Sequence, residues 1–430
     1  MPFELLHPAD QIVLIMQRIY AYGMTTTSGG NLSIKDENGD IWITPGGIDK
    51  GSLTRRDIIC VKADGTQVGP HKPSSEFPFH RKVYEKRPDL KSVLHAHPPA
   101  LVAFSIVRKV PQTFLIPNVH EICGQVAYAA YALPGSDLLG DTIAAVFEKG
   151  INTVLLENHG IVVGADTLFE AFMAFETLDF CARLEIAAHR LGTPRPLTTE
   201  QITLTRRKQQ PALTSFVAGP MGSPERAARQ EMCDLIHRSY DQRLVSSTQG
   251  TFSQRLEGNN FVITPYGADR KYLEPGDLVR IENGRAEAGK KPSRSVGLHQ
   301  RIYEAHPHIH AIIIAHPPAA MVFAVTDAVF DSRTIPESYI LLRTIPKLPY
   351  GSHFTDPVGT AAAFSAKVPL VIQENDCLIV TGSTLLGAFD RLEVAEYSAQ
   401  AIIAAQELGA IVAINDQQVD ELITAFKLEK

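Results

Sequence analysis

Apolar side chains recur along this chain with two different spacings. In four segments they fall every three or four positions, which predicts helices, and in shorter runs they are continuous or alternate, which predicts strands. A further helix is expected near Ser74, whose hydroxyl precedes an acidic residue as in a helix N-cap. The main helices are predicted at residues 10–23, 167–192, 230–243 and 383–409, and the most apolar strands at 91–97 and 152–160.

The same pattern of residues occurs twice along the chain. Residues 72–100 and 291–319 are identical at 12 of 29 positions at a fixed offset of 219. Such an internal repeat predicts two domains of the same fold. We place the first at residues 1–205 and the second at 225–430. Residues 206–224 are predicted to be a linker, because they are basic at first and then rich in Pro, Gly and Ser.

The order of elements indicates the fold class. Strands and helices are mixed without strict alternation, and several strands are joined by short glycine turns, as in residues 28–34 and 40–47. This favours an α/β protein made of two tandem α/β/α sandwich domains, each around a mainly antiparallel sheet.

Composition narrows the classes of function. The chain has 430 residues, 44% of them hydrophobic and 20% charged, with a formal net charge of −6. A mildly acidic balance argues against nucleic acid or an anionic membrane as the main partner. No apolar run is long enough to span a membrane, the first residues lack the features of a signal peptide, and the five cysteines are scattered. We therefore expect a reduced, cytoplasmic protein.

Three histidines and a glutamate of the first repeat form a candidate metal site. His95 and His97 alternate at the end of an apolar strand, so their side chains share one face. His159 follows a second buried strand and precedes Gly160, which predicts a tight turn at that strand end. Three neutral histidines with an open position are typical of a catalytic zinc-like ion. Glu76 would act as a base beside the ion or as a temporary fourth ligand.

The second repeat supports this grouping by what it lacks. Ser295 stands in place of Glu76, Ile314 in place of His95, and Asp376 in place of His159, although the surrounding residues are retained. Residues that are lost together are better explained as one functional set. His80 persists as His299, and we therefore interpret both as structural.

Small residues suggest an anion pocket near the metal. Three short segments, residues 28–31, 44–47 and 74–75, offer backbone N–H groups or hydroxyls to an oxyanion. The second repeat has Arg294 in place of Ser75, which either binds an anion or fills the old pocket with a salt bridge, and we favour filling. The predicted substrate-binding residues are Ser28, Gly29, Asn31, Thr44, Gly46, Ser74 and Ser75.

The motifs SGGNLS, ITPGG, SSE, HAHPP and ENHG, in this order, resemble the class II aldolase/adducin family, the fold of L-fuculose-phosphate aldolase. The resemblance covers both repeats. It implies that His95, His97 and His159 hold Zn²⁺, or another divalent ion such as Mn²⁺ or Co²⁺, and that Glu76 is the acid/base. It also implies that Asn31, Thr44, Gly46, Ser74 and Ser75 hold the phosphate of a small phosphorylated sugar.

The chain departs from the family pattern in two ways. Glu121 stands where the aldolases have a tyrosine that a neighbouring subunit supplies as a proton donor. The tandem arrangement also suggests that two chains, as a homodimer, form the family's fourfold ring from four repeats. In that ring, Tyr339 of the second repeat is the residue that would reach the candidate metal site of a first repeat.

The resemblance leaves the reaction open. The leading hypothesis is a metal-dependent aldolase, a lyase of carbohydrate metabolism that cleaves a phosphorylated ketose through a metal-stabilised enediolate. Alternatives are an epimerase, dehydratase or decarboxylase acting on a sugar phosphate or sugar acid phosphate. A further alternative is a non-catalytic, adducin-like interaction protein, which the second repeat alone would fit.

Overall fold

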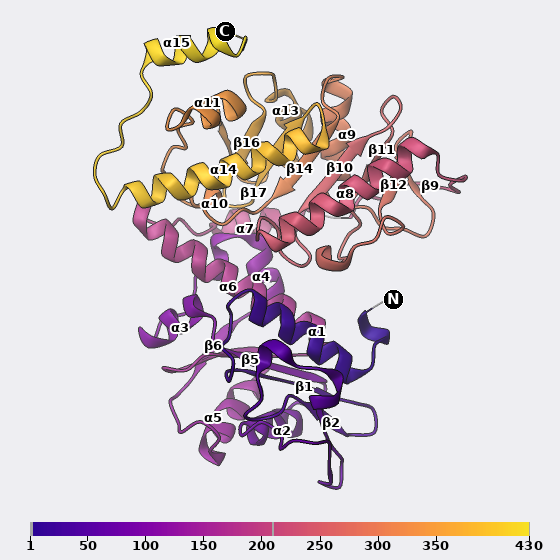
Figure 1. Ribbon diagram of the computed structural model, residues 1–430, viewed down its shortest axis with the longest axis vertical. Helices are drawn as coiled ribbons and strands as arrows, with labels where there is room; N and C mark the ends of the chain where they lie inside the picture. Colours follow the sequence, from indigo (N-terminus) through magenta and orange to yellow (C-terminus); the bar gives the residue numbers. More distant parts are fainter. Residues whose placement is uncertain (1–2, 209, 430) are drawn as a thin grey trace. The chain divides into compact units, whose positions relative to one another are not determined.

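The computed structural model describes residues 3–208 and 210–429, which form two compact units. The first contains the chain up to Phe114 and Asn118–Arg183, and the second contains Leu115–Pro117 and the chain from Leu184 onwards. Each unit is an α/β fold built on a single mixed sheet (Figure 1). The prediction of two α/β domains is therefore confirmed.

The first unit has an eight-stranded sheet in the order β4-β3-β2-β1-β5-β8-β7-β6. Its pairs are antiparallel except β6 with β7. The strands are β1 (Asn31–Lys35), β2 (Ile41–Ile43), β3 (Ile59–Val61), β4 (Gln67–Val68), β5 (Ser92–Ala96), β6 (Val126–Ala129), β7 (Thr153–Leu156) and β8 (Ile161–Ala165). The helices are α1 (Pro8–Ala21), α2 (Phe77–Lys86), α3 (Pro99–Ile106), α4 (Pro117–Cys123), α5 (Asp137–Phe147) and α6 (Leu168–Leu191), whose residues from Leu184 onwards belong to the second unit.

The second unit repeats this topology. Its sheet runs β15-β16-β17-β14-β10-β11-β12-β13-β9. Read from the opposite edge, this is the strand order of the first sheet, with β9 added next to β13. The strands are β9 (Ser215–Phe216), β10 (Thr251–Arg255), β11 (Phe261–Ile263), β12 (Val279–Glu282), β13 (Arg285–Glu287), β14 (Ala311–Ala315), β15 (Lys347–Leu348), β16 (Leu370–Gln373) and β17 (Cys377–Gly382). The helices are α7 (Thr199–Thr205), α8 (Ser223–Asp241), α9 (Val296–Ala305), α10 (Ala320–Ala324), α11 (Pro336–Leu342), α12 (Ser352–Thr355), α13 (Pro357–Ala362), α14 (Leu385–Ala405) and α15 (Asp416–Ala425).

Helix periodicity explains how the helices bury one face. In α1, Ile12, Ile15, Met16 and Ile19 are buried, at the three- and four-residue spacing of a helix face. Full burial of such a side chain contributes about 1.5–3 kcal/mol.

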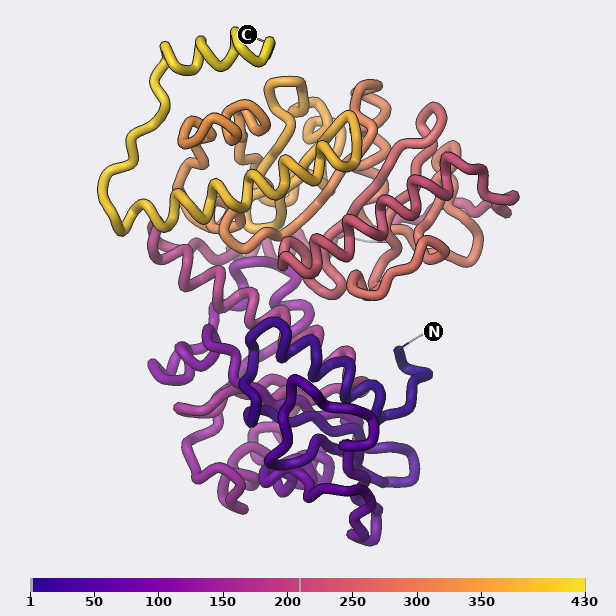
Figure 2. The backbone as a smooth tube through the Cα atoms, viewed as in Figure 1, coloured from indigo at the N-terminus to yellow at the C-terminus, as the bar shows by residue number. Residues whose placement is uncertain are grey.

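In the second unit, α8 and α14 lie along the same face of the sheet (Figure 1). The tube in Figure 2 shows an extended run between α14 and α15.

Two boundaries differ from the predicted ones. The predicted linker contains β9, which pairs in parallel with β13. The helix predicted at residues 230–243 begins at Ser223, because Pro224 suits its first turn and Ala228 and Arg229 extend its buried face. Part of the polar, apparently aperiodic segment is thus ordered against the second sheet.

Two sequence expectations about the environment have a structural counterpart. None of the described helices is both long and apolar enough to cross a membrane. All five cysteines are buried and carry free thiols. Localisation in the cytoplasm stays a prediction.

Candidate metal centre

Strand β5 brings the first two histidines to the site. His95 lies within β5 and is fully buried, and His97 follows the strand directly, so the two-residue spacing directs both rings to one side. His95 Nδ1 lies 2.9 Å from the carbonyl oxygen of Ile161 in β8. A carbonyl only accepts, so Nδ1 carries the proton, and Nε2 keeps its lone pair for a ligand. This main-chain contact orients the ring.

A tight turn between β7 and β8 brings the third histidine. Asn158 has φ of 51°, in the left-handed region that asparagine tolerates, and His159 follows it. Leu156 N–H donates to the Gly160 carbonyl at 2.8 Å, which closes the turn. A Cβ at Gly160 would lie 2.5 Å from the Ala96 oxygen, so only glycine lets the turn approach β5 this closely. The prediction of a tight turn at this strand end is confirmed.

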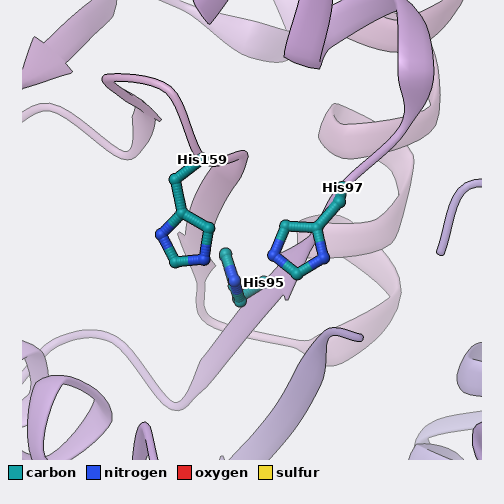
Figure 3. A group of neighbouring side chains, drawn as sticks. All are labelled: His95, His97 and His159. Atoms are coloured by element: carbon teal, nitrogen blue, oxygen red, sulfur yellow. The ribbon is translucent and has the colours of Figure 1, made fainter. Parts of the chain in front are cut away.

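The three imidazoles converge on one point (Figure 3). Their ring centroids lie 4.6 Å apart for His95 and His97, 4.8 Å for His95 and His159, and 5.0 Å for His97 and His159. One nitrogen from each ring lies within 4.8 Å of the others. Residues from two distant parts of the chain therefore meet as the sequence predicted.

The chemistry of this cluster fits a divalent ion. Burial, and then the neighbouring imidazoles, lowers the pKa of His97 to about 3, and burial likewise lowers the pKa of His95 to about 3. Both rings are therefore neutral near pH 7, which is the form that ligates metal. The Nε2 atoms of His95 and His97 are buried, and neither has a hydrogen-bond partner among the described residues. Buried polar atoms without partners are costly, and a bound cation would satisfy both.

Glu76 lies beside the histidine cluster. Its Oε2 is 3.3 Å from His95 Nε2, and its Oε1 is 3.6 Å from His159 Nε2. The residue is the N-cap of α2, which begins at Phe77 rather than near Ser74 as predicted. The prediction was wrong because the Ser74 hydroxyl accepts from the Glu76 N–H at 3.3 Å and forms a local turn ahead of the helix. This placement points the carboxylate at the histidines.

A directed chain of hydrogen bonds leads through the core to Glu76. Asn31 Nδ2–H donates to Glu76 Oε2 at 2.7 Å, and the side-chain amide oxygen of Asn31, Oδ1, contacts His80 Nε2. His80 Nε2 must therefore donate, and because burial lowers the pKa of His80 well below its usual value, its Nδ1 is a bare acceptor. Ser33 donates to that Nδ1 at 2.7 Å and accepts from the Tyr84 hydroxyl at 2.8 Å. Every donor in the chain points toward the carboxylate.

The second unit keeps the buried serine, histidine and tyrosine of this hydrogen-bond network. It lacks the asparagine and the glutamate to which the network leads in the first unit. Ser253 contacts His299 Nδ1 at 2.6 Å and the Tyr303 hydroxyl at 2.7 Å, as their counterparts do in the first unit. In the first sheet Asn31 is opposite His95, whereas in the second Thr251 is opposite Ile314. His299 Nε2 is buried without a partner among the described residues. Sequence comparison identified His80 as structural but missed its link to Glu76.

The predicted anion-binding segments lie together around Glu76. Ser74 N–H donates to the Thr44 carbonyl at 3.1 Å, and a Cβ at Gly46 would lie 3.2 Å from the Pro73 oxygen. A Cβ at Gly29 would lie 2.9 Å from His97 Nδ1, so this glycine backs the metal cluster. Ser28 and Ser75 are exposed, whereas the buried Thr44 hydroxyl accepts from the Leu32 N–H at 3.2 Å. Their role in binding an anion stays a prediction.

The two remaining predicted residues lie elsewhere in their units. Glu121 is exposed on α4. Tyr339 is half-buried on α11 of the second unit, where the Arg343 guanidinium lies 5.2 Å from its ring centroid. A catalytic role for either residue stays a prediction.

A different polar cluster occupies the corresponding place in the second unit. The Asp376 carboxylate contacts Lys208 Nζ at 3.2 Å and His353 Nε2 at 3.1 Å. Burial alone would raise the pKa of Asp376, but these two neighbours outweigh it and hold that pKa well below its usual value. His353, Asp376 and Cys377 have potential ligand atoms within 4.8 Å of one another. However, burial raises the pKa of Cys377 so far that it stays a thiol, and the Lys208 ammonium already neutralises the carboxylate.

Comparison with known proteins agrees with the internal repeat. The family model described as Class II Aldolase and Adducin N-terminal domain matches residues 10–186 and again residues 230–403. The chain is 32% identical over 203 residues to a 5-deoxy-D-ribulose 1-phosphate aldolase of Bacillus thuringiensis serovar kurstaki. The matched region covers 45% of this chain and 91% of the relative. It is 31% identical over 179 residues to a 3-oxo-tetronate 4-phosphate decarboxylase of Escherichia coli, which covers 41% of this chain and 84% of the relative. A solved structure of L-fuculose 1-phosphate aldolase matches with a TM-score of 0.42 and 30% identity, covering 47% of this chain and 95% of that one.

Proposed function

The chain belongs to the class II aldolase and adducin family, and on that basis we propose that it is a metal-dependent lyase that cleaves a phosphorylated ketose by a retro-aldol reaction. The observation that carries the proposal is the position of Glu76. Its two carboxylate oxygens lie 3.3 and 3.6 Å from Nε2 atoms of two histidines in a cluster of three. A base held beside a metal-binding set is the arrangement that proton transfer next to a polarised carbonyl requires.

The histidine cluster would hold the ion. Three neutral imidazoles suit Zn²⁺ and also accept Mn²⁺ or Co²⁺. When bound, the ion would draw electrons from the carbonyl of the ketose and so favour breaking of the bond between the carbons α and β to that carbonyl. The glycine and serine segments around Glu76 would hold the phosphate, because their backbone N–H groups lie at small residues that an anion can approach closely.

Glu76 would move the proton. In cleavage, a substrate hydroxyl loses a proton as its carbon becomes an aldehyde, and the other fragment takes up a proton to become the second product. Glu76 Oε2 is held by Asn31, whereas Oε1 is buried without a hydrogen-bond partner among the described residues. We therefore assign proton transfer to Oε1, because that atom keeps its accepting capacity.

The direct test is an assay of the metal-loaded chain with L-fuculose 1-phosphate and 5-deoxy-D-ribulose 1-phosphate. We expect release of dihydroxyacetone phosphate from at least one of them, and loss of that release in Glu76→Gln. Absence of product from both, together with absence of carbon dioxide from a 3-oxo-tetronate 4-phosphate, would contradict a lyase assignment.

Decarboxylation is the second candidate reaction. It is favoured by the similarity to the Escherichia coli decarboxylase and by Glu121, which stands where a tyrosine donor is expected in an aldolase. Carbon dioxide release without aldol cleavage would select this reaction. Epimerisation and dehydration of the same class of substrate would leave the carbon skeleton intact, and product analysis would separate them.

We also propose that two chains assemble as a homodimer with four repeats in a pseudo-fourfold ring, in which Tyr339 reaches the metal site of a first repeat. Tyr339→Phe should then lower turnover at unchanged metal content, because the hydroxyl donates a proton to the leaving fragment. Unchanged turnover in this variant would remove Tyr339 from the site, whereas a monomer in solution would remove the ring.

A further inference from the structure

Asp376 has the same backbone position in the second unit as His159 has in the first. The asparagine before it has a positive φ in both units, 51° at Asn158 and 52° at Asn375. The N–H groups of His159 and Asp376 each donate at 3.2 Å to the carbonyl three residues earlier. The Asp376 carboxylate therefore extends from the turn that, in the first unit, supplies a histidine to the candidate metal centre.

A cation supplied by the protein itself balances the buried Asp376. Lys208 Nζ lies 3.4 Å from Oδ1 and 3.2 Å from Oδ2, so the ammonium contacts both carboxylate oxygens. The Asp376 side chain is only 1% exposed, and that of Lys208 is 16% exposed. An unpaired carboxylate at such a place would be costly, and the burial of Asp376 therefore depends on this ammonium.

The ammonium comes from the segment between the repeats. Lys208 N–H donates to the Thr205 carbonyl at 2.9 Å, and the hydroxyls of Thr205 and Tyr350 lie 2.6 Å apart. The ring centroid of Phe354, in α12, lies 5.8 Å from Lys208 Nζ. These contacts hold the lysine against the turn that leads into α12. Lys208 lies between the two regions that match the family model, so it has no counterpart in the first repeat.

Two further potential metal ligands lie beside the carboxylate. His353 Nε2 lies 3.1 Å from Asp376 Oδ2 and donates to it, because an ionised carboxylate only accepts. Cys377 follows Asp376 in the chain and carries a buried, free thiol. The three residues have ligand atoms within 4.8 Å of one another. A histidine, a carboxylate and a thiol are donors that Zn²⁺ accepts.

His316, which corresponds to His97 of the first unit, is unsatisfied in the same region. The residue is 9% exposed, and both of its ring nitrogens are buried without a hydrogen-bond partner among the described residues. Burial lowers the pKa of His316 to about 4, and the charges of Asp376 and Lys208 shift that pKa in opposite directions. The second unit thus retains near Asp376 the kind of neutral imidazole that the candidate metal centre of the first unit contains.

We propose that the Lys208 ammonium takes the place of a metal ion in the second unit. The three side chains beside it, His353, Asp376 and Cys377, form a latent Zn²⁺ site from which the ammonium excludes the metal. The lysine is tethered next to the carboxylate, whereas a metal ion has to come from solution. A metal ion would also have to displace the thiol proton of Cys377. The ammonium thereby restricts metal binding to the first repeat, whatever reaction that repeat performs.

The test is the metal content of the full-length chain after the ammonium is removed. Lys208→Met removes the charge at similar side-chain length, and Lys208→Gln removes it but retains a donor to Asp376, which guards against misfolding. After loading with Zn²⁺ and removal of excess ion, each variant should hold one more ion per chain than the wild type. Lys208→Arg, which keeps a cation, and Lys367→Met, a change at an exposed lysine, should hold the wild-type number.

Two further measurements locate the added ion. Loading with Co²⁺ should give Lys208→Met the near-ultraviolet absorption of a thiolate–Co²⁺ bond, which the wild type should lack because the first unit's three histidines include no sulfur ligand. The double variant K208M/D376N removes both charges together and should hold the wild-type number of ions.

Three results would overturn the proposal. They are the wild-type number of ions in both Lys208→Met and Lys208→Gln, an added ion in Lys208→Arg, and an added ion that persists in K208M/D376N. An added ion without the thiolate absorption would overturn it too, because Cys377 would then not be a ligand. Each comparison is made with the wild type, so the outcome does not depend on how many ions the first unit holds.

Discussion

Gly160 shows how a missing side chain defines the metal centre. A Cβ at this position would lie 2.5 Å from the Ala96 carbonyl oxygen and 2.7 Å from His97 Cδ2. Both neighbours belong to the segment that carries the histidines, and the first is main chain that cannot move independently. The second repeat, which has Cys377 at the corresponding place, lacks two of the three histidines. Close approach of the turn is therefore part of the site.

We predict that Gly160→Ala lowers metal affinity at least about tenfold, because the turn and the His97 ring must separate. Metal titration with a fluorescent competitor measures this change. Gly192→Ala is the matched control, since a Cβ at Gly192 meets nothing within 4 Å. Equal affinity of the two variants would show that the turn is less tightly constrained than the structure indicates.

His80 is a positioning residue whose effect reaches Glu76 through Asn31. We predict that His80→Gln lowers kcat roughly 10–100-fold, as loss of a supporting contact typically does, and leaves KM and metal content nearly unchanged. The equivalent change in the second repeat, His299→Gln, breaks the same buried network without a link to a base. Steady-state kinetics of both variants decides the matter, and a parallel loss of turnover in both would indicate a purely structural role.

At the scale of elements, one contact pattern joins strand and helix in both units. Ser33 of β1 binds His80 and Tyr84 of α2, and Ser253 of β10 binds His299 and Tyr303 of α9. These polar groups are buried, and in each unit the serine hydroxyl contacts both the histidine and the tyrosine, although His299 Nε2 lacks a partner among the described residues. The network ties the helix that begins at the site to the central strand of the sheet.

This network makes stability depend on pH. Burial lowers the pKa of His299 to about 3, below the value near 6.5 of an unfolded chain. Between these two values the unfolded chain binds a proton that the folded chain does not, so stability falls as pH decreases from about 6.5. The contribution of one such group is at most about 1.4 kcal/mol per pH unit.

We predict that His299→Gln flattens the fall in the free energy of unfolding between pH 7 and pH 5. The exposed His310→Gln should keep the wild-type slope. Denaturant unfolding at several pH values gives both slopes. A wild-type slope in His299→Gln would show that the buried ring contributes no linkage.

The sequence allowed the elements and the metal set to be predicted because both depend on short-range patterns and on the repeat. Strand alternation placed His95 and His97 on one face, and the joint replacement of Glu76, His95 and His159 in the second copy added His159 to the set. The Ile161 acceptor was not predictable, since a main-chain carbonyl leaves no trace in residue identity. The ordered linker was also missed, because two residues of β9 are too few to show a period.

At the scale of the whole molecule, one fold is used for two different sites. The first unit has two neutral, buried imidazoles whose Nε2 atoms lack hydrogen-bond partners among the described residues, beside a carboxylate, whereas the second has a carboxylate already paired with an ammonium. Both units retain the same strand order and the same core network. The duplication thus preserved the scaffold while the polar groups at its centre diverged.

The most direct test of the account is the metal content of the purified full-length chain. After loading with Zn²⁺ and removal of excess ion, we predict one ion per chain, lost in His95→Ala and His159→Ala and retained in His316→Ala. Two ions per chain, with one lost in His316→Ala, would contradict our account of the second unit. No bound ion would contradict the metal centre and favour a non-catalytic interaction protein.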